Sequence, residues 1–357
     1  MAFIKLYREK LQHNYKILDE LFKENNIEWG VVSKILCGNK TFLKELIALG
    51  PTEIFDSRVS NLKIVKQLNP EIQTIYIKPP PKRIIPNVVR HADVSFNTEF
   101  DTIKRLSDEA VKQEKTHKII IMIEMGDLRE GVMGDDLLMF YKEVFELPNI
   151  QVVGIGANLN CLNGVMPSED KLIQLGLYKQ LIEAKFNVKI PWVSGGTSVT
   201  IPLVHRRLIP KGINHFRIGE ALFFGKDLFT GGVFPGMHYD VFELFAEIIE
   251  LSEKPLLPSG ELGKNVAGDT FEMDEELYGK TTHRAIIDVG LLDIDTDQLR
   301  PRYGDLDLAG ASSDMMVIDL GDNEANLKVG DLMRFQLDYM GALKLLNSSY
   351  INKLVEE

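Results

Sequence analysis

The sequence has few cysteines, no long apolar run and no excess of positive charge. Its two cysteines, Cys37 and Cys161, lie far apart, which excludes a disulfide framework and a CxxC zinc site. The first residues carry frequent charges without an apolar leader, and no run of about eighteen apolar residues occurs, so we expect a cytoplasmic protein with no membrane partner. The formal net charge of −11 predicts no nucleic-acid partner, because such partners need clustered Lys and Arg.

What is present is an alternation of short apolar runs with longer amphipathic stretches, from about residue 28 to 225. This pattern is typical of repeated βα units around a parallel sheet. The candidate strands are Trp29–Ser33, Glu53–Phe55, Thr74–Ile77, Asp93–Phe96, Lys118–Glu124, Gln151–Ala157, Pro191–Val193 and His215–Arg217. The candidate helices are Lys40–Leu49, Arg58–Leu68, Thr102–Gln113, Leu137–Phe145 and Asp170–Ala184. The order predicts an eight-stranded (β/α)8 TIM-like barrel, with an open doubly wound sheet as the alternative.

After about residue 236 the pattern changes to strand-like segments joined by connections rich in Gly, Asp and Pro. The segments are Val241–Leu251, His283–Leu292, Met315–Leu320 and Leu332–Leu337. We therefore expect an α/β protein with a barrel in residues 1–232 and a mainly-β domain in residues 233–357. A helical pattern over Arg8–Glu24 is expected to pack on the barrel.

Active sites of such barrels lie at the carboxyl ends of the strands, so the residue that ends each run is informative. Lys34 follows the first run directly. Enclosed by the barrel wall, its amine would be nucleophilic toward an aldehyde, whereas a lysine that only reaches solvent from a strand end is the plainer interpretation.

Two loops near the end of the barrel suit a phosphate group. Arg217 lies on the last run, and a turn containing Gly219 follows it at once. One run earlier, Ser194–Ser198 supplies flexible backbone and hydroxyl groups. Adjacent loops after the last two strands are the usual phosphate position in a barrel.

Taken in order, four segments resemble the successive motifs of fold-type III pyridoxal-phosphate enzymes, the alanine racemase family: Val31–Gly38, Glu124–Gly131, Ser194–Ser198 and Phe216–Gly225. The Cys-Gly after the lysine and the Cys after Asn-Leu-Asn are most similar to ornithine racemases and related broad-specificity amino-acid racemases. The resemblance extends into the β domain through Gly290, Ser312–Asp314, Val329–Asp331 and Asp338-Tyr339.

The resemblance implies a role for each matched residue. Lys34 would carry pyridoxal 5'-phosphate as a Schiff base and act as the base on one face of the substrate. Arg217 would hydrogen-bond the pyridine nitrogen, supported by Asn158 or Asn160 where the family has a histidine. The phosphate would be held by Ser198, Thr197, Gly219, Glu220 and Tyr339. Arg129 would help position Lys34 or the substrate carboxylate, and Asp314 would also bind the substrate.

The acid/base on the opposite face departs from the family. There the family has a tyrosine in a Gly-Tyr-Ala-Asp segment of the partner subunit, and this sequence has Leu291. Asp293, Ser313, Tyr303 and Cys161 are the open candidates. For Cys161 and Cys37, small apolar fillers near the barrel mouth are the plainer interpretation. No structural metal is predicted.

The resemblance predicts an isomerase that interconverts L- and D-amino acids, with ornithine, another basic amino acid or alanine as substrate. It also implies a homodimer with shared active sites. A lyase or decarboxylase of the same fold is the alternative, and a pyridoxal-phosphate-binding homeostasis protein is another, which the second domain disfavours.

Overall fold

A computed structural model describes residues 2–264, 270–303 and 306–356. The chain forms two compact units, one of Glu9–Tyr239 and one that combines Met1–Arg8 with Asp240–Glu357. The sequence-based boundary at 232/233 assigned the first residues to the barrel. In the structure they belong to the second unit, because β1 (Phe3–Tyr7) pairs antiparallel with β11 (Phe242–Pro255) and parallel with β17 (Asn352–Glu356).

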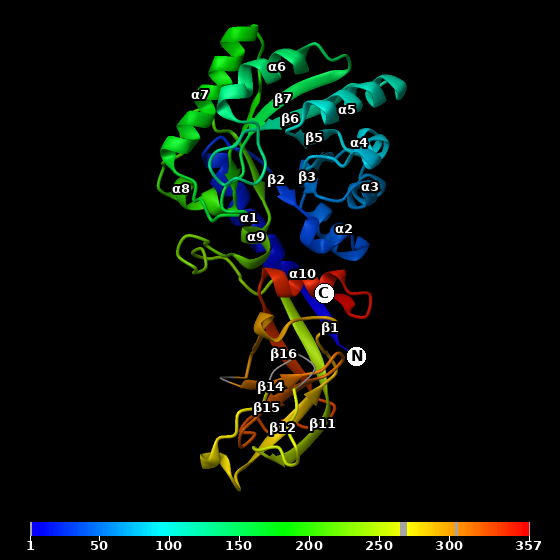
Figure 1. Cartoon of the computed structure of the whole chain (residues 1–357), viewed down its shortest axis with the longest axis vertical. Coiled ribbons are helices and arrows are strands. Elements are labelled where there is room, and N and C mark those ends of the chain that lie inside the picture. Colours follow the sequence, from blue (N-terminus) through cyan, green and yellow to red (C-terminus); the bar gives the residue numbers. More distant parts are fainter. Residues whose placement is uncertain (1, 265–269, 304–305, 357) are drawn as a thin grey trace. The chain divides into compact units, whose positions relative to one another are not determined.

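The larger unit is a parallel barrel, in which each of the eight predicted runs forms a strand (Figure 1). The order around the sheet is β8-β7-β6-β5-β4-β3-β2-β10-β9. The ring closes where Asn214, just before β10, accepts a hydrogen bond from the Val193 N–H of β8 at 2.8 Å. The strands are β2 (Glu28–Val32), β3 (Glu53–Asp56), β4 (Gln73–Tyr76), β5 (Val94–Asn97), β6 (His117–Met122), β7 (Ile150–Gly156), β8 (Trp192–Ser194), β9 (Gly196–Thr197) and β10 (His215–Ile218).

Helices surround this sheet, and the TIM-like prediction is confirmed. They are α1 (Arg8–Glu24), α2 (Lys40–Ala48), α3 (Val59–Leu68), α4 (Ile85–His91), α5 (Phe100–Lys112), α6 (Leu137–Phe145), α7 (Glu169–Phe186), α8 (Ile201–His205) and α9 (Glu220–Phe224). The predicted α1 packs on the barrel unit through Asn14, whose amide donates to the Leu222 carbonyl at 3.0 Å.

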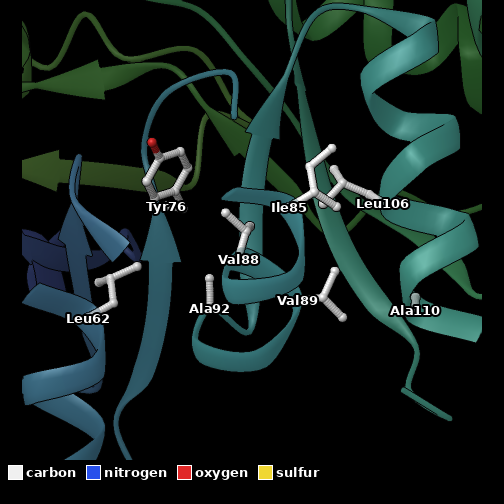
Figure 2. Packing of buried hydrophobic residues seen from close by; sticks show 8 residues of the cluster. All are labelled: Leu62, Tyr76, Ile85, Val88, Val89, Ala92, Leu106 and Ala110. Atoms are coloured by element: carbon white, nitrogen blue, oxygen red, sulfur yellow. The ribbon is translucent and has the colours of Figure 1, made fainter. Parts of the chain in front are cut away.

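Buried aliphatic side chains join the helices to the strands. Figure 2 shows one such cluster, in which side chains of α3, α4 and α5 gather around Tyr76 of β4. A second cluster comes from strands β3 to β7 without any helix residue, and it fills the middle of the barrel: Phe55, Ile75, Val94, Phe96, Ile120, Met122 and Val153. Close packing of this kind fixes the strand ends that carry the site.

The second unit is a mainly antiparallel sheet of order β13-β16-β11-β12-β15-β14, with β1 beside β11 and β17 parallel to β1 on its other side. Its remaining elements are β12 (Thr281–Ile287), β13 (Leu299–Pro301), β14 (Asp307–Ala311), β15 (Met316–Asp319), β16 (Leu332–Leu337) and α10 (Tyr339–Asn347). The predicted β domain is confirmed, although β1, β13, β14, β17 and α10 were not predicted. Across the described parts of the chain, no helix is both long and apolar enough to cross a membrane.

Candidate active site

Lys34 begins a short 3-10 helix (Lys34–Leu36) directly after β2. The preceding Ser33 is buried, and its hydroxyl donates to the Asp56 carboxylate at the end of β3, at 2.9 Å. Burial raises the pKa of Asp56, although its hydrogen bonds oppose this. Cys37 ends the turn with a left-handed φ of 49°. The Lys34 side chain itself is exposed, so the expectation that the barrel wall encloses its stem is wrong.

Arg217, on the neighbouring strand β10, is only 4% exposed. Its Nη1 donates to the Ser194 carbonyl at 2.6 Å and to the Ser194 hydroxyl at 2.7 Å. Its Nη2 donates to the Ala157 carbonyl at 2.8 Å and to Asn158 Oδ1 at 2.7 Å. The guanidinium lies 5.4 Å from the centre of the Phe96 ring. Burial lowers the pKa of Arg217 to about 10.

The structure places Asn158, at the end of β7, against Arg217. The Asn158 amide in turn donates to the carboxylate of Glu130, and Glu130 pairs with the guanidinium of Arg129. This pairing is the first cause of the raised pKa of Arg129. The Arg129 side chain is 39% exposed, so its guanidinium is held by Glu130 at a solvent-accessible position. The result is a polar chain from the buried Arg217 to the exposed Arg129.

The two loops predicted for a phosphate meet in the structure. Ser198 follows β9 and is buried, and its hydroxyl accepts a hydrogen bond from the Ala221 N–H at 3.1 Å. Ala221 lies in the first turn of α9, which Glu220 begins and Gly219 caps. Thr197 precedes a short 3-10 helix, Ser198–Thr200. The side chains of Thr197 and Thr200 each accept a hydrogen bond from the other residue's backbone N–H, which forms a capping box. The hydroxyl of Ser198 and the start of α9 are therefore neighbours at the carboxyl ends of the strands.

Cys161 lies in an exposed loop, residues 159–165, that a buried carboxylate organises. Asp127 is 1% exposed, and its Oδ2 accepts the N–H groups of Cys161 at 3.0 Å and Leu162 at 2.9 Å. Its Oδ1 accepts those of Asn163 at 3.1 Å and Val165 at 3.3 Å. Burial alone would raise the pKa of Asp127, but these four donors lower it on balance. The Cys161 thiol donates to the Leu159 carbonyl at 3.5 Å.

The remaining candidates lie in the second unit. The Asp293 carboxylate accepts a hydrogen bond from the Ser348 hydroxyl at 2.5 Å. The Ser313 hydroxyl donates to Asp314 at 3.2 Å, and the Tyr303 hydroxyl donates to the Leu332 carbonyl at 3.2 Å. Tyr339 is the first residue of α10, and Leu291 donates its N–H to the Ser312 carbonyl at 2.9 Å. The structure thus assembles Lys34, Arg217, Asn158, Arg129, Ser198 and Cys161 within one unit, and the others within the second.

Sequence reasoning missed Glu130 and the buried His215 and Glu53, which connect to Arg217 through Ser194, and it assigned Ser194 only to a phosphate loop. A signal was available, because Glu53 and His215 are polar residues inside runs that a barrel buries on both faces. Within the described ranges, no group of three or more His, Cys, Asp or Glu is arranged to hold a metal ion.

The fold and the site together define a class of barrel enzyme. In this class a lysine and a buried arginine lie at the carboxyl ends of adjacent strands of a (β/α)8 barrel, and an antiparallel β unit follows the barrel. The chain belongs to the alanine racemase family, since the model for the alanine racemase N-terminal domain matches residues 7–227.

Three known proteins resemble the chain along almost its whole length. It is 37% identical to ornithine racemase of Acetoanaerobium sticklandii over 345 residues, 96% of each chain. It is 30% identical to lysine racemase of Thermotoga maritima over 348 residues, covering 98% of this chain and 96% of that one. Alanine racemase from Bartonella henselae, solved with covalently bound pyridoxal phosphate, has the same fold, with a TM-score of 0.74, 15% identity and 99% coverage of each chain.

Proposed function

We propose that the protein is a pyridoxal-phosphate-dependent racemase of a basic amino acid, with ornithine and lysine as the first substrates to test. The observation that carries the proposal is the buried Arg217 on the strand next to the one that Lys34 follows. The substrate class comes from the two relatives, which are named for ornithine and lysine and match the chain over nearly its full length.

The side chains at these strand ends fit pyridoxal 5'-phosphate. The Lys34 amine suits its aldehyde, and the guanidinium of Arg217 suits its ring nitrogen. The Ser198 hydroxyl and the start of α9, which lie together, suit its phosphate, with Thr197, Gly219 and Glu220 beside them. We propose that Tyr339 adds a further phosphate contact. When bound, the cofactor withdraws electron density from the α-carbon and makes its proton acidic.

Each residue then has a defined task. Lys34 Nζ would hold the cofactor and move the α-proton on one face of the substrate. Arg217 would donate to the ring nitrogen, and Asn158 would keep the guanidinium in place. Arg129, solvent-accessible and paired with Glu130, would orient the substrate carboxylate, with Asp314 as a second substrate contact.

For the proton on the opposite face we propose Cys161 as the first group to test. Its thiol is exposed and lies in the barrel unit, on the loop that follows Asn158, and Asn158 contacts Arg217. Asp293, Ser313 and Tyr303 each make hydrogen bonds within the second unit and stay candidates. Cys161→Ala should abolish exchange on one face only, so that one enantiomer still loses its α-proton to solvent. Equal exchange of both enantiomers in this variant would exclude the thiol.

We further propose a homodimer whose partner subunit completes the site. Sedimentation velocity at micromolar concentration should give about twice the 40.4 kDa chain mass. A stable monomer that racemises at full rate would contradict this part.

The attachment of the cofactor tests the proposed function directly. The purified protein with pyridoxal phosphate should be yellow, and borohydride followed by peptide mapping should find the label on Lys34. Chiral chromatography should then show D-ornithine or D-lysine forming from the L-enantiomer. Lys34→Ala should lose both the label and the activity, whereas Lys44→Ala, which removes an exposed lysine from α2, should keep them. A colourless protein or a label elsewhere would overturn the proposal, and loss of substrate without the D-enantiomer would indicate a lyase.

A further inference from the structure

Three buried polar side chains from separate strands form a connected row that ends at Arg217. Glu53 begins β3 and is 6% exposed, whereas His215, which begins β10, and Ser194, which ends β8, are fully buried. His215 Nε2 lies 2.9 Å from Glu53 Oε2, and His215 Nδ1 lies 2.7 Å from the Ser194 hydroxyl. That hydroxyl also accepts a hydrogen bond from Arg217 Nη1 at 2.7 Å. We call these three residues the Glu53–His215–Ser194 relay.

The barrel wall holds the relay rigidly. The His215 ring stacks on Trp192 with ring centres 4.6 Å apart and an interplanar angle of 9°. Gln73 donates its amide to the other oxygen of Glu53 at 3.1 Å. On β2, Gly30 makes room for Glu53, because a Cβ at Gly30 would lie 2.6 Å from the Glu53 Cβ. These contacts orient the His215 ring and the Glu53 carboxylate.

The hydrogen bonds determine where the protons lie. A guanidinium can only donate, so Ser194 Oγ is an acceptor toward Arg217. In the relay we assign the one hydroxyl proton of Ser194 to the bond with His215 Nδ1, which makes Nδ1 an acceptor. With Nδ1 as the acceptor, His215 carries its proton on Nε2 and donates it to Glu53. All donors point the same way, from Arg217 to the Glu53 carboxylate, and each bond strengthens the next.

The relay bears on the charge of Arg217, because all four acceptors of its guanidinium are neutral oxygens. A buried guanidinium with neutral partners needs a carboxylate nearby to compensate its charge. Glu130 is reached through Asn158, but Glu130 already pairs with Arg129. The relay connects Arg217 to a second carboxylate, that of Glu53, which is buried within the same barrel.

We propose that Glu53, His215 and Ser194 are positioning residues that hold Arg217 charged and in one orientation, with the guanidinium presented to the ring nitrogen of the cofactor. The inference rests on the proposed function for its catalytic consequence, but the hydrogen-bond arrangement itself does not depend on it. Removing the Glu53 charge would leave the charge of Arg217 less compensated, and removing the Ser194 hydroxyl would take away one acceptor of Arg217 Nη1 and so loosen its orientation.

The arrangement is tested first on the unaltered protein. Nitrogen-15 NMR of the histidine-labelled, cofactor-loaded protein should show that His215 has a protonated Nε2 and an unprotonated Nδ1 that accepts a hydrogen bond. The His215 signals are assigned as those missing in His215→Gln. Ser194→Ala should move the Nδ1 signal and leave the Nε2 proton in place. A protonated Nδ1 in the unaltered protein would overturn the relay, whether or not the protein racemises any amino acid.

The functional consequence is tested with Glu53→Gln and Ser194→Ala. Glu28→Gln is the matched control, because Glu28 is an exposed carboxylate at the start of β2 that accepts a hydrogen bond from Trp192 at 2.9 Å. Both relay variants should lower kcat about tenfold or more with KM within about twofold, and should shift the visible absorbance of the bound cofactor. The control should change none of these. Relay variants with the spectrum and kcat of the unaltered enzyme would refute the inference, whereas an unaltered enzyme without racemase activity would refute the proposed function instead.

Discussion

Asp127→Asn is expected to loosen the 159–165 loop without unfolding the barrel. The carboxylate accepts four backbone N–H groups, two at each oxygen. The amide keeps one oxygen, so its NH2 group faces two of these four N–H groups. Two unmet donors cost about 1 to 3 kcal/mol each when buried. Because Cys161, Leu162 and Asn163 are exposed, water can reach the loop, so we expect the lower limit of about 1 kcal/mol for each donor, about 2 kcal/mol in total.

Amide hydrogen exchange measures this change residue by residue. A loss of about 2 kcal/mol corresponds to roughly thirtyfold faster exchange in the loop, at the Cys161 and Leu162 pair or at the Asn163 and Val165 pair. Amides of the barrel strands should keep their rates, and KM should rise more than kcat falls if Cys161 faces the substrate. Asp135→Asn, which changes an exposed carboxylate just before α6, is the matched control. Unchanged exchange in the loop of the Asp127→Asn protein would show that the carboxylate does not organise it.

Other expectations follow from packing and burial. Burial lowers the pKa of His117 from 6.5 to about 4, so the folded state resists a proton that the unfolded chain accepts. The free energy of unfolding should therefore fall by about 3 kcal/mol as the pH drops from 6.5 to 4. The urea midpoint of His117→Gln should no longer show this dependence on pH, whereas that of the exposed control His205→Gln should keep it. An equal slope in both variants would assign it to other groups. Gly290→Ala should destabilise the β unit by about 1 to 3 kcal/mol, because its Cβ would lie 2.4 Å from the Asp314 backbone nitrogen. Gly310→Ala, with nothing within 4 Å, should not, and a thermal melt compares the two.

The barrel was predictable because its strands are buried on both faces and read as short apolar runs between amphipathic helices. Strand β1 was not, because its partners β11 and β17 lie at the other end of the chain. Helix α10 did carry a local signal, since Asp338 caps it by accepting the Gly341 N–H at 2.9 Å.

At the site, position alone placed Lys34 and Arg217 at strand ends. The choice between Asn158 and Asn160 needed the fold, because Arg217 lies 59 residues from Asn158. The Glu53 to His215 contact spans 162 residues, and no spacing rule links such positions. The exposure of Lys34 also depends on how the turn leaves β2, which the residue types do not determine.

The most direct test of the central claim is exchange of the α-proton. L-ornithine and L-lysine are incubated in deuterium oxide with the cofactor-loaded protein, and the α-position is followed by proton NMR and polarimetry. We predict that the optical rotation decays to zero while one deuterium enters each α-carbon, and that Lys34→Ala shows neither change. Retention of both the α-proton and the optical rotation with ornithine, lysine and alanine alike would contradict the assignment of this protein as an amino-acid racemase.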